Sequence, residues 1–433
     1  MQYKKLELYS QIIILIKTIE AKRCETMKKN NATRKLNPIL YILVRLFFLP
    51  YLVKKYRIVG VNSELFKTLP PPFLVVGNHV SMFDPPMVNV FIPHRIHFVM
   101  SDANLRTPIP QWAYGRLCNV IAKTKAVTDS GAVRKILQLI QKNRIICLFP
   151  EGRSSWDGVT HNIFPSTAKL IRKLQIPVVV PLIEGGYLSH PRWGVKVRPG
   201  KLVIRYKKIF DGDELQALTV AEIHQRLVQE LDHDDYQFQR QSGQHYYSAR
   251  GAEYLERLLF ICPNCKGVTT LRSEGNRFFC TCCAFDAQYT SEGFLLSQLD
   301  CCRELKTLTE WVNWQQRECD LLIQKTSKTN QSHPFFRDQQ VTLWMGYKTQ
   351  PLTRVSSGTL SLFADRFVFT GEEKLPLEFP IHEIEGVQVL LANKFEFYYQ
   401  GSLYKFDFFD PRTSGYKYML FVQKIAPANA ELD

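Results

Sequence analysis

The chain has 433 residues, which is enough for two or three domains with a sizeable core and excludes a single small module. Its 56 lysines and arginines outnumber 40 aspartates and glutamates, which gives a net charge of +16. A charge of this size indicates a negatively charged partner, either nucleic acid or an anionic membrane surface, and does not by itself choose between them.

The N-terminal region, residues 1–57, is basic and contains one apolar run, Ile39–Val53. Lysines and arginines flank this run from residue 27 to residue 57, with no acidic residue among them, which favours anionic lipid as the partner. The run has about fifteen residues and contains Arg45 and Pro50, whereas crossing a bilayer takes about twenty apolar residues. We therefore expect a helix that begins near Pro38 and lies in the membrane interface. A buried amphipathic helix and a transmembrane anchor remain alternatives.

Residues 1–26 have only Ile12–Ile16 as an apolar segment and no cleavage site of small residues, which argues against a secretory signal. The expected location is accordingly the cytoplasmic face of the cell membrane, with peripheral attachment and membrane lipids as partners.

Residues 58–236 alternate apolar strands with amphipathic helices, the pattern of an α/β layered domain with a mostly parallel, buried sheet. The sequence Thr219-Val220-Ala221-Glu222 is a capping box that predicts a helix to about Leu231. The predicted strands are 73–76, 96–100, 145–149, 178–182 and 202–206, and the predicted helices between them are 133–141 and 167–174.

A histidine and an aspartate, His79 and Asp84, follow the first of these strands at a spacing of five. A hydroxyl becomes a good nucleophile when a base takes its proton, and neutral imidazole suits this near pH 7. A carboxylate on the other ring nitrogen fixes the tautomer. Gly77-Asn78 ends the strand and Pro85-Pro86 stops a long helix, so one tight turn is expected to fold Asp84 back onto His79.

The same spacing recurs at His97 and Asp102, and there it predicts nothing catalytic. Residues 96–100 read as an extended strand, which would hold residues five positions apart at about 15 Å. The context of the pair, and not its spacing, distinguishes His79.

A polar loop, residues 149–155, follows the predicted strand 145–149 with the sequence Phe-Pro-Glu-Gly-Arg-Ser-Ser. It places Glu151, Gly152, Arg153 and Ser154 at the carboxyl end of a strand, where ligands bind in α/β sheets. The guanidinium of Arg153 matches a phosphate in shape and charge. A solvated turn with an incidental arginine is the alternative for the loop taken alone.

Together, His79 and Asp84 after Gly77-Asn78, the loop 149–155, and Val180-Pro181-Leu182 resemble the glycerolipid acyltransferases, the family of 1-acylglycerol-3-phosphate O-acyltransferase. The resemblance covers about residues 60–235. It implies direct transfer of a fatty acyl group from acyl-CoA or acyl carrier protein to the hydroxyl of a lysophosphatidate-like acceptor, without a covalent acyl-enzyme. It also implies that His79 is the base with Asp84 as its partner, that Glu151 and Gly152 seat the acceptor, and that Pro181 shapes the donor or acyl channel.

The chain departs from the family pattern at two positions. The family has an arginine in a second motif that binds the acceptor phosphate, and the corresponding stretch here, 119–125, offers Lys125 instead. Lysine is a point charge and not a fork, so it would bind phosphate with looser geometry. The arginine of the third motif stands one place early, at Arg153.

A cysteine cluster lies in residues 250–300, after the apolar, helix-like stretch 253–260. Cys262 and Cys265 form one pair, and Cys280 and Cys283 a second, with Cys282 spare. Two such pairs are typical of a zinc ribbon, and four thiolates would make the zinc structural. Disulfides or free thiols are the alternative. Ribbons often bind nucleic acid, but the expected basic and aromatic pattern is missing around 272–279, so no nucleic acid is expected.

Residues 301–333 are predicted to form a helix, at 304–324, and a polar linker. Residues 340–433 then read as seven strands and a final helix capped by Ser414, a pattern that resembles the pleckstrin-homology/GRAM superfold. The predicted strands are 341–347, 359–363, 366–370, 377–379, 387–391, 394–399 and 403–408.

The sequence thus predicts an α/β acyltransferase core with a mostly parallel sheet, a zinc ribbon and a C-terminal PH-like β domain. The predicted function is acyl transfer to lysophosphatidate or a related lysophospholipid. The alternative is a catalytically weak membrane-binding scaffold that uses the same core, and the substituted second motif is the reason to keep it.

Overall fold

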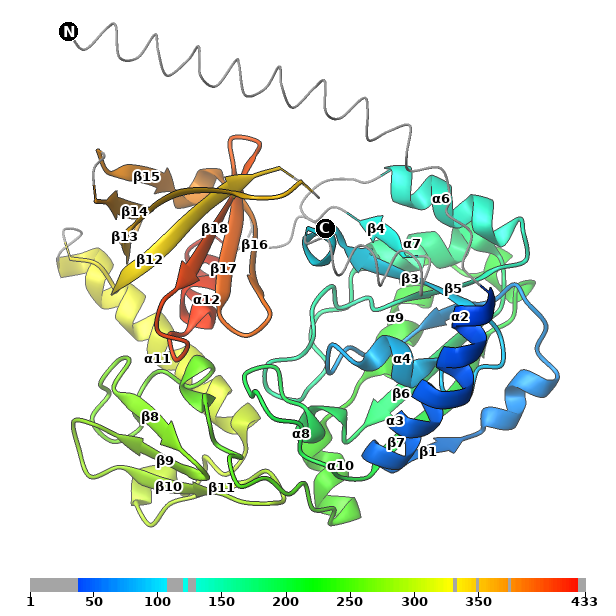
Figure 1. Ribbon diagram of the computed structural model, residues 1–433, viewed down its shortest axis with the longest axis horizontal. Coiled ribbons are helices and arrows are strands. Elements are labelled where there is room, and N and C mark those ends of the chain that lie inside the picture. Colours follow the sequence, from blue (N-terminus) through cyan, green and yellow to red (C-terminus); the bar gives the residue numbers. More distant parts are fainter. Residues whose placement is uncertain are drawn as a thin grey trace, which may run out of the picture.

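The computed structural model describes residues 38–106, 120–123, 130–329, 333–347, 350–372 and 375–426. These residues form a seven-stranded mixed sheet, a four-stranded antiparallel sheet and a second seven-stranded, antiparallel sheet. Figure 1 shows the first sheet with its helices in blue to green, the small sheet in yellow-green, and the last sheet in yellow to red.

The N-terminal helical segment runs without a break through α2 (Pro38–Leu43), a π-type turn (Val44–Phe48) and α3 (Leu49–Tyr56). Pro50 lies in the first turn of α3, where its missing N–H is tolerated after the wide π turn. Within the part of the chain that the structure describes, no helix is both long and apolar enough to cross a membrane.

The central sheet has the strand order β1-β7-β6-β2-β5-β3-β4, and every neighbouring pair is parallel except β6 and β7. This mostly parallel sheet agrees with the sequence prediction, which missed the short strands β1 and β4. The strands are β1 (Ile58–Val61), β2 (Leu74–Val76), β3 (Ile96–Ser101), β4 (Ile121–Lys123), β5 (Ile145–Leu148), β6 (Val178–Glu184) and β7 (Leu202–Phe210).

Helices cover both faces of the central sheet, because its strands are apolar on both sides. In β2, the side chains of Leu74 and Val76 join the core under one layer, while Val75 joins the core under the other. The first layer contains α6 (Ser130–Ile140), α7 (Pro165–Leu174) and α9 (Val220–Leu231), and the second contains α3 and α4 (Asp84–Val88). The capping box that opens α9 is present, with Thr219 and Glu222 bonded reciprocally.

The small sheet, in the order β11-β10-β9-β8, follows two short helices, α8 (Gly186–Ser189) and α10 (Asp235–Ser242). The helix-like stretch expected at 253–260 is wrong: only a single 3-10 turn, Leu255–Arg257, forms there. Its apolar side chains are buried in the core between the sheets and do not line a helix face. The strands are β8 (Leu271–Glu274), β9 (Arg277–Cys280), β10 (Asp286–Tyr289) and β11 (Leu295–Leu296).

The long helix α11 (Leu308–Thr329) leads to the C-terminal sheet, whose order is β15-β14-β13-β12-β18-β17-β16. All of the expected strands are present, and Ser414 caps the final helix α12 (Gly415–Ile425) by accepting the N–H of Lys417. We call residues 336–425 the C-terminal unit. Its strands are β12 (Phe336–Gly346), β13 (Thr353–Leu362), β14 (Arg366–Gly371), β15 (Leu377–Pro380), β16 (Ile384–Leu390), β17 (Lys394–Tyr399) and β18 (Ser402–Phe408).

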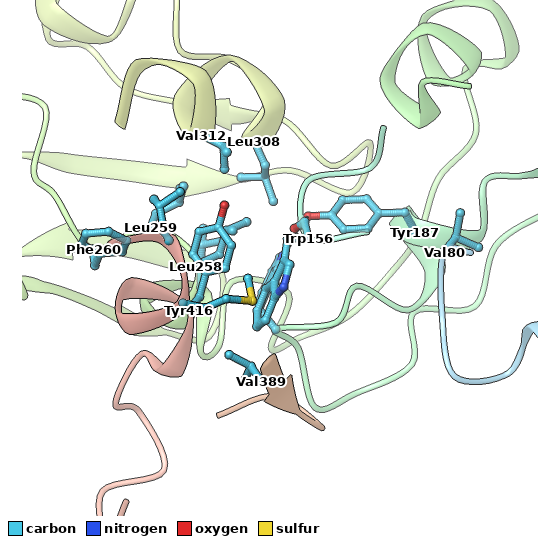
Figure 2. Packing of buried hydrophobic residues seen from close by; sticks show 14 of the residues in the cluster. Val80, Trp156, Tyr187, Leu258, Leu259, Phe260, Leu308, Val312, Val389 and Tyr416 are labelled. Carbon is cyan, nitrogen blue, oxygen red and sulfur yellow. Dashed lines mark hydrogen bonds between the residues drawn. The ribbon is translucent and has the colours of Figure 1, made fainter. Parts of the chain in front are cut away.

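One cluster of buried apolar side chains runs through all three sheets. Figure 2 shows part of it, with Trp156 of the central domain next to Tyr416 of α12 and Val389 of β16, and with Leu258 and Leu308 close by. The three units therefore share one hydrophobic core.

Candidate active site

His79 lies in the loop that leaves the carboxyl end of β2. The preceding residue, Asn78, is buried and fixes this loop to β6: its Oδ1 accepts the N–H of Ile183 at 2.8 Å and its Nδ2 donates to the Ile183 carbonyl at 3.0 Å. The imidazole of His79 stacks on Phe149, with the ring centroids 4.7 Å apart. Phe149 thus supports one face of the imidazole, and the His79 side chain remains 22% exposed.

Asp84 lies at the start of α4, directly behind the imidazole. Its Oδ2 is 2.7 Å from Nδ1 of His79, so Nε2 is the ring nitrogen left for a substrate. The carboxylate of Asp84 is fully buried. It also accepts the N–H groups of Val80 (2.7 Å) and Ser81 (3.0 Å) and the Ser81 hydroxyl (3.0 Å). The tight turn expected from the sequence is formed by these bonds, and its geometry suits a general base.

Glu151 joins the second loop to the first. Its Oε1 accepts the backbone N–H of His79 at 2.7 Å, and its Oε2 accepts the backbone N–H of His161 at 3.3 Å. A third bond, from the N–H of Ser155 to the His79 carbonyl at 2.8 Å, holds the same two loops together. Glu151 is only 5% exposed, and both of its carboxylate oxygens bond to backbone N–H groups, one of them that of His79.

Two groups of this loop have shifted pKa values. Burial raises the pKa of Glu151 to about 7, although the hydrogen bonds from His79 and His161 act in the opposite direction. Burial by itself would lower the pKa of His161, but the hydrogen bond and charge of Asp157, whose Oδ1 is 2.7 Å from Nε2, raise it above its usual value. The raised pKa favours the positively charged form of His161 beside the loop.

The other loop residues that the sequence predicted to bind substrate lie in different environments. Gly152 has a φ of +68°, a left-handed conformation that suits glycine and turns the chain after Glu151. The guanidinium of Arg153 points to α12, where Nη1 lies 3.5 Å from Sδ of Met419. The carbonyl of Ser154 accepts a hydrogen bond from Nη1 of Arg192 at 3.1 Å.

Pro181 is buried in β6 and packs beside the histidine loop. A Cβ atom on Gly77 would lie 3.2 Å from Cγ of Pro181 and 3.3 Å from its carbonyl oxygen, a tight contact, so the close approach of β6 favours glycine there. Lys125, the candidate for the second motif, lies outside the described residues.

The other histidine–aspartate pair is held apart by its strand. His97 lies within the extended strand β3 and Asp102 begins the 3-10 turn (Asp102–Leu105) after it, so the chain between them spans about 15 Å. Identical spacing thus gives a contact at His79 and a separation at His97.

Sequence reasoning missed the role of three residues near the site. Asn78 was expected only to end the strand, and its bonds to the backbone of Ile183 were not predicted. His190 and Arg192 were not predicted either, since they come from the segment after α8. The ring of His190 packs edge-on against Phe83 at 5.1 Å, and burial lowers its pKa, against the opposing charge of Asp84.

The predicted cysteine ligands come together in the small sheet. The sulfur atoms of Cys262, Cys265, Cys280 and Cys283 all lie within 4.8 Å of one another. The pairs Cys262–Cys283 and Cys265–Cys280 are 3.6 and 3.8 Å apart, far longer than a disulfide bond of about 2.05 Å. Two sulfurs bound tetrahedrally at about 2.3 Å to one zinc ion would lie about 3.8 Å apart, so this cluster is compatible with zinc.

Part of this chain is similar to known proteins. The crystal structure of the 1-acyl-sn-glycerophosphate (LPA) acyltransferase PlsC from Thermotoga maritima is similar at 24% identity and a TM-score of 0.34, over 43% of this chain and 80% of that chain. Residues 60–183, which carry His79, Asp84 and Glu151, match the model of the family described as Acyltransferase.

Proposed function

We propose that this protein is an acyltransferase that moves a fatty acyl group from acyl-CoA or acyl carrier protein to the free hydroxyl of lysophosphatidate or a related lysophospholipid. The observation that carries the proposal is the 2.7 Å contact between His79 and the buried Asp84. The match of residues 60–183 to the Acyltransferase family supports it.

In the proposed reaction, Nε2 of His79 takes the proton of the acceptor hydroxyl while Asp84 stabilises the imidazolium. The hydroxyl oxygen attacks the thioester carbonyl carbon, and the tetrahedral intermediate collapses with cleavage of the carbon–sulfur bond. The leaving thiolate takes the proton from the imidazolium. The products are an ester and a free thiol, and His79 returns to its neutral form.

The N-terminal helical segment supports a membrane location for this reaction. Its Leu49, Leu52 and Tyr56 are buried, and Nη1 of Arg45 donates to the Ile92 carbonyl at 2.8 Å, so the arginine is turned to the protein. Lys54 and Lys55 follow the apolar part and would meet anionic headgroups, which makes the helix an interfacial anchor. The large apolar side chains exposed on it are Ile42, Leu43, Leu46, Phe47, Phe48 and Tyr51.

The four cysteines are proposed to bind one structural zinc ion through Cys262, Cys265, Cys280 and Cys283. Four protein ligands leave no open position, so the ion would stabilise the small sheet and take no part in acyl transfer.

The test compares two histidine variants. His79→Gln should lose at least about a hundred-fold in kcat with a lysophosphatidate acceptor and an acyl-CoA or acyl carrier protein donor, because the base is removed. His97→Gln should keep most of the activity. Thermal melts verify that both variants are folded, and equal losses in two folded variants would contradict the assignment of the base.

A catalytically weak scaffold is the second candidate, and the engagement of Arg153 with α12 is the observation that favours it. Such a protein would bind liposomes with or without His79 and would turn over no thioester against a panel of lysophospholipids.

A further inference from the structure

A groove lies between the N-terminal helical segment and the loop that follows α4. It has a volume of about 380 Å³, within the range of about 300–1,000 Å³ that is usual for ligand sites. Five apolar residues make up most of its surface, and two basic residues complete it. The lining residues are Leu49, Pro50, Val53, Val90, Phe91, Arg45 and Lys54. The groove thus combines an apolar bed with cationic groups.

Both walls of the groove are fixed by contacts outside it. Phe91 uses the space that Gly60 leaves, where a Cβ atom would lie 2.8 Å from Cδ2 of the ring, and it packs edge-on to Tyr206 with the ring centroids 6.3 Å apart. On the helix side, Nη1 of Arg45 donates to the Ile92 carbonyl at 2.8 Å. Since the walls are already ordered, a ligand loses little affinity in shaping the site.

The two adjacent lysines of α3 differ in their surroundings. The ammonium group of Lys55 lies over the rings of Tyr51 and Tyr56, 5.5 Å from each centroid, and Lys55 is not among the residues that line the groove. Lys54 lines the groove, and among the described residues no side chain forms a hydrogen bond or ion pair with its ammonium group. A cation beside an apolar surface suits a ligand that has an anionic head and an apolar chain.

The charge around the groove distinguishes between possible occupants. Within the part of the chain that the structure describes, no carboxylate lies within 4 Å of the charged groups of Arg45 and Lys54. Residues 28–37, which directly precede α2, carry four basic residues and no acidic one, so their charge matches the site poorly. A zwitterionic lipid brings no net charge. An anionic phospholipid is the occupant whose charge complements the site.

The groove lies on the helical segment whose exposed apolar side chains, among them Phe47 and Tyr51, are proposed to enter the membrane interface. Pro50, which lines the groove, is itself exposed, so a lipid of the bound leaflet reaches the groove without leaving the interface. We propose that this groove binds one acyl chain of an anionic phospholipid from the membrane leaflet, with the lipid phosphate at Lys54. The inference rests on the proposed membrane attachment and not on acyl transfer.

The experiment uses full-length protein, fully bound to vesicles that contain photoreactive phosphatidylglycerol or phosphatidylcholine, each with a diazirine in the middle of one acyl chain. Tandem mass spectrometry locates the labels. Labels on Phe47 and Phe48 report contact with the bilayer and serve as the reference, while labels on Val53 and Phe91 report the groove. Relative to the reference, groove labels should be about five-fold more frequent with phosphatidylglycerol than with phosphatidylcholine.

Three variants test the assignment. Lys54→Gln should remove the preference for phosphatidylglycerol in the groove, whereas Lys55→Gln, the matched control, should keep it. Val90→Trp fills the groove and should lower the groove labels by about ten-fold with both lipids, while the reference labels stay within about two-fold. Thermal melts verify that each variant is folded, and Lys54→Gln, at an exposed position, keeps the test decisive if Val90→Trp is unstable.

Three results would overturn the inference. Equal groove labelling by the two lipids would show that the site does not recognise an anionic headgroup. Reference labels without groove labels would show that lipid does not enter the groove. Equal effects of Lys54→Gln and Lys55→Gln would assign the preference to general surface charge. Each of these results leaves the proposed acyl transfer intact, and a protein that acylates no lysophospholipid would leave the lipid site in place.

Discussion

Nη1 of Arg106 lies 2.6 Å from Oε2 of Glu396, a residue 290 positions further along the chain. Both side chains are buried, at 5% and 0% exposure. Arg106 follows β3, so the pair fixes the C-terminal unit near the carboxyl ends of the parallel strands, the edge where His79 and Glu151 also lie.

Arg106→Met should destabilise the protein by about 3–5 kcal/mol, because it leaves the Glu396 carboxylate buried without its cation. Burial raises the pKa of Glu396, and the charge of Arg106 opposes this, so the variant should take up a proton at Glu396 on folding. Arg205→Met breaks the exposed ion pair with Glu184 and should cost less than about 1 kcal/mol in urea unfolding. Equal losses of unfolding free energy in the two variants would show that the buried pair contributes no more to stability than the exposed one.

Asp84→Asn should lower kcat by about a thousand-fold or more, with a much smaller effect on the KM for either substrate, because an amide no longer fixes the tautomer of His79 or stabilises its imidazolium. Single-turnover rates measure the chemical step directly. The exposed Asp211→Asn serves as the control. A kcat within ten-fold of wild type would exclude the dyad as the general base.

The stability of the wild-type protein should carry a pH signature of Glu151. Its folded pKa of about 7 lies above the usual 4.5, so the folded protein binds more protons than the unfolded chain between these values, and stability falls as the pH rises through this window. Glu151→Gln lacks this proton. The difference in unfolding free energy between wild type and variant should therefore shift by about 2–3 kcal/mol between pH 4.5 and pH 7.5. Parallel pH profiles in urea unfolding would contradict the shifted pKa.

Zinc removal should unfold the small sheet. Purified protein is expected to hold one zinc ion per chain, and Cys265→Ser should lower both the metal content and the melting temperature. Cys265 is exposed, so the substitution leaves no cavity. The neighbouring Cys282→Ser, also at an exposed position, should leave metal content unchanged. Equal metal content in the two variants would exclude the proposed ligand set.

Phe47→Glu should weaken binding to vesicles of anionic phospholipid by roughly thirty-fold, which corresponds to about 2 kcal/mol for one large apolar side chain. Phe47 is 69% exposed on the N-terminal helical segment. Leu321→Glu is the matched control on α11, where the leucine is 59% exposed. If the two variants co-sediment with vesicles equally well, the membrane surface lies elsewhere.

The sequence predicts best those features that depend on residues close to one another in the chain. His79 and Asp84 meet because glycine, asparagine and two prolines confine the turn between them, and Ser414 and Thr219 cap their helices through bonds within three residues. The strands of the central sheet follow from apolar runs bounded by breakers. All of these features depend on neighbours in the chain.

The contacts that position the loops join residues that are far apart in the sequence, so a local sequence pattern does not predict them. Glu151 reaches the backbone of His79 across 72 positions, and Arg153 reaches Met419 across 266. The guanidinium was expected to bind a substrate phosphate, and in the structure its Nη1 lies against Met419 of α12, a contact that the sequence did not indicate. The helix expected at 253–260 fails for a related reason, since its apolar side chains are needed at the junction of three sheets.

The hydrogen bonds around Asp84 have one more consequence. Three donors from its own turn and one imidazole occupy the carboxylate before any substrate arrives. The carboxylate cannot rotate or exchange partners without breaking the turn, so its orientation toward the imidazole is set when the chain folds. In the proposed reaction, Asp84 therefore needs no reorientation during each proton transfer.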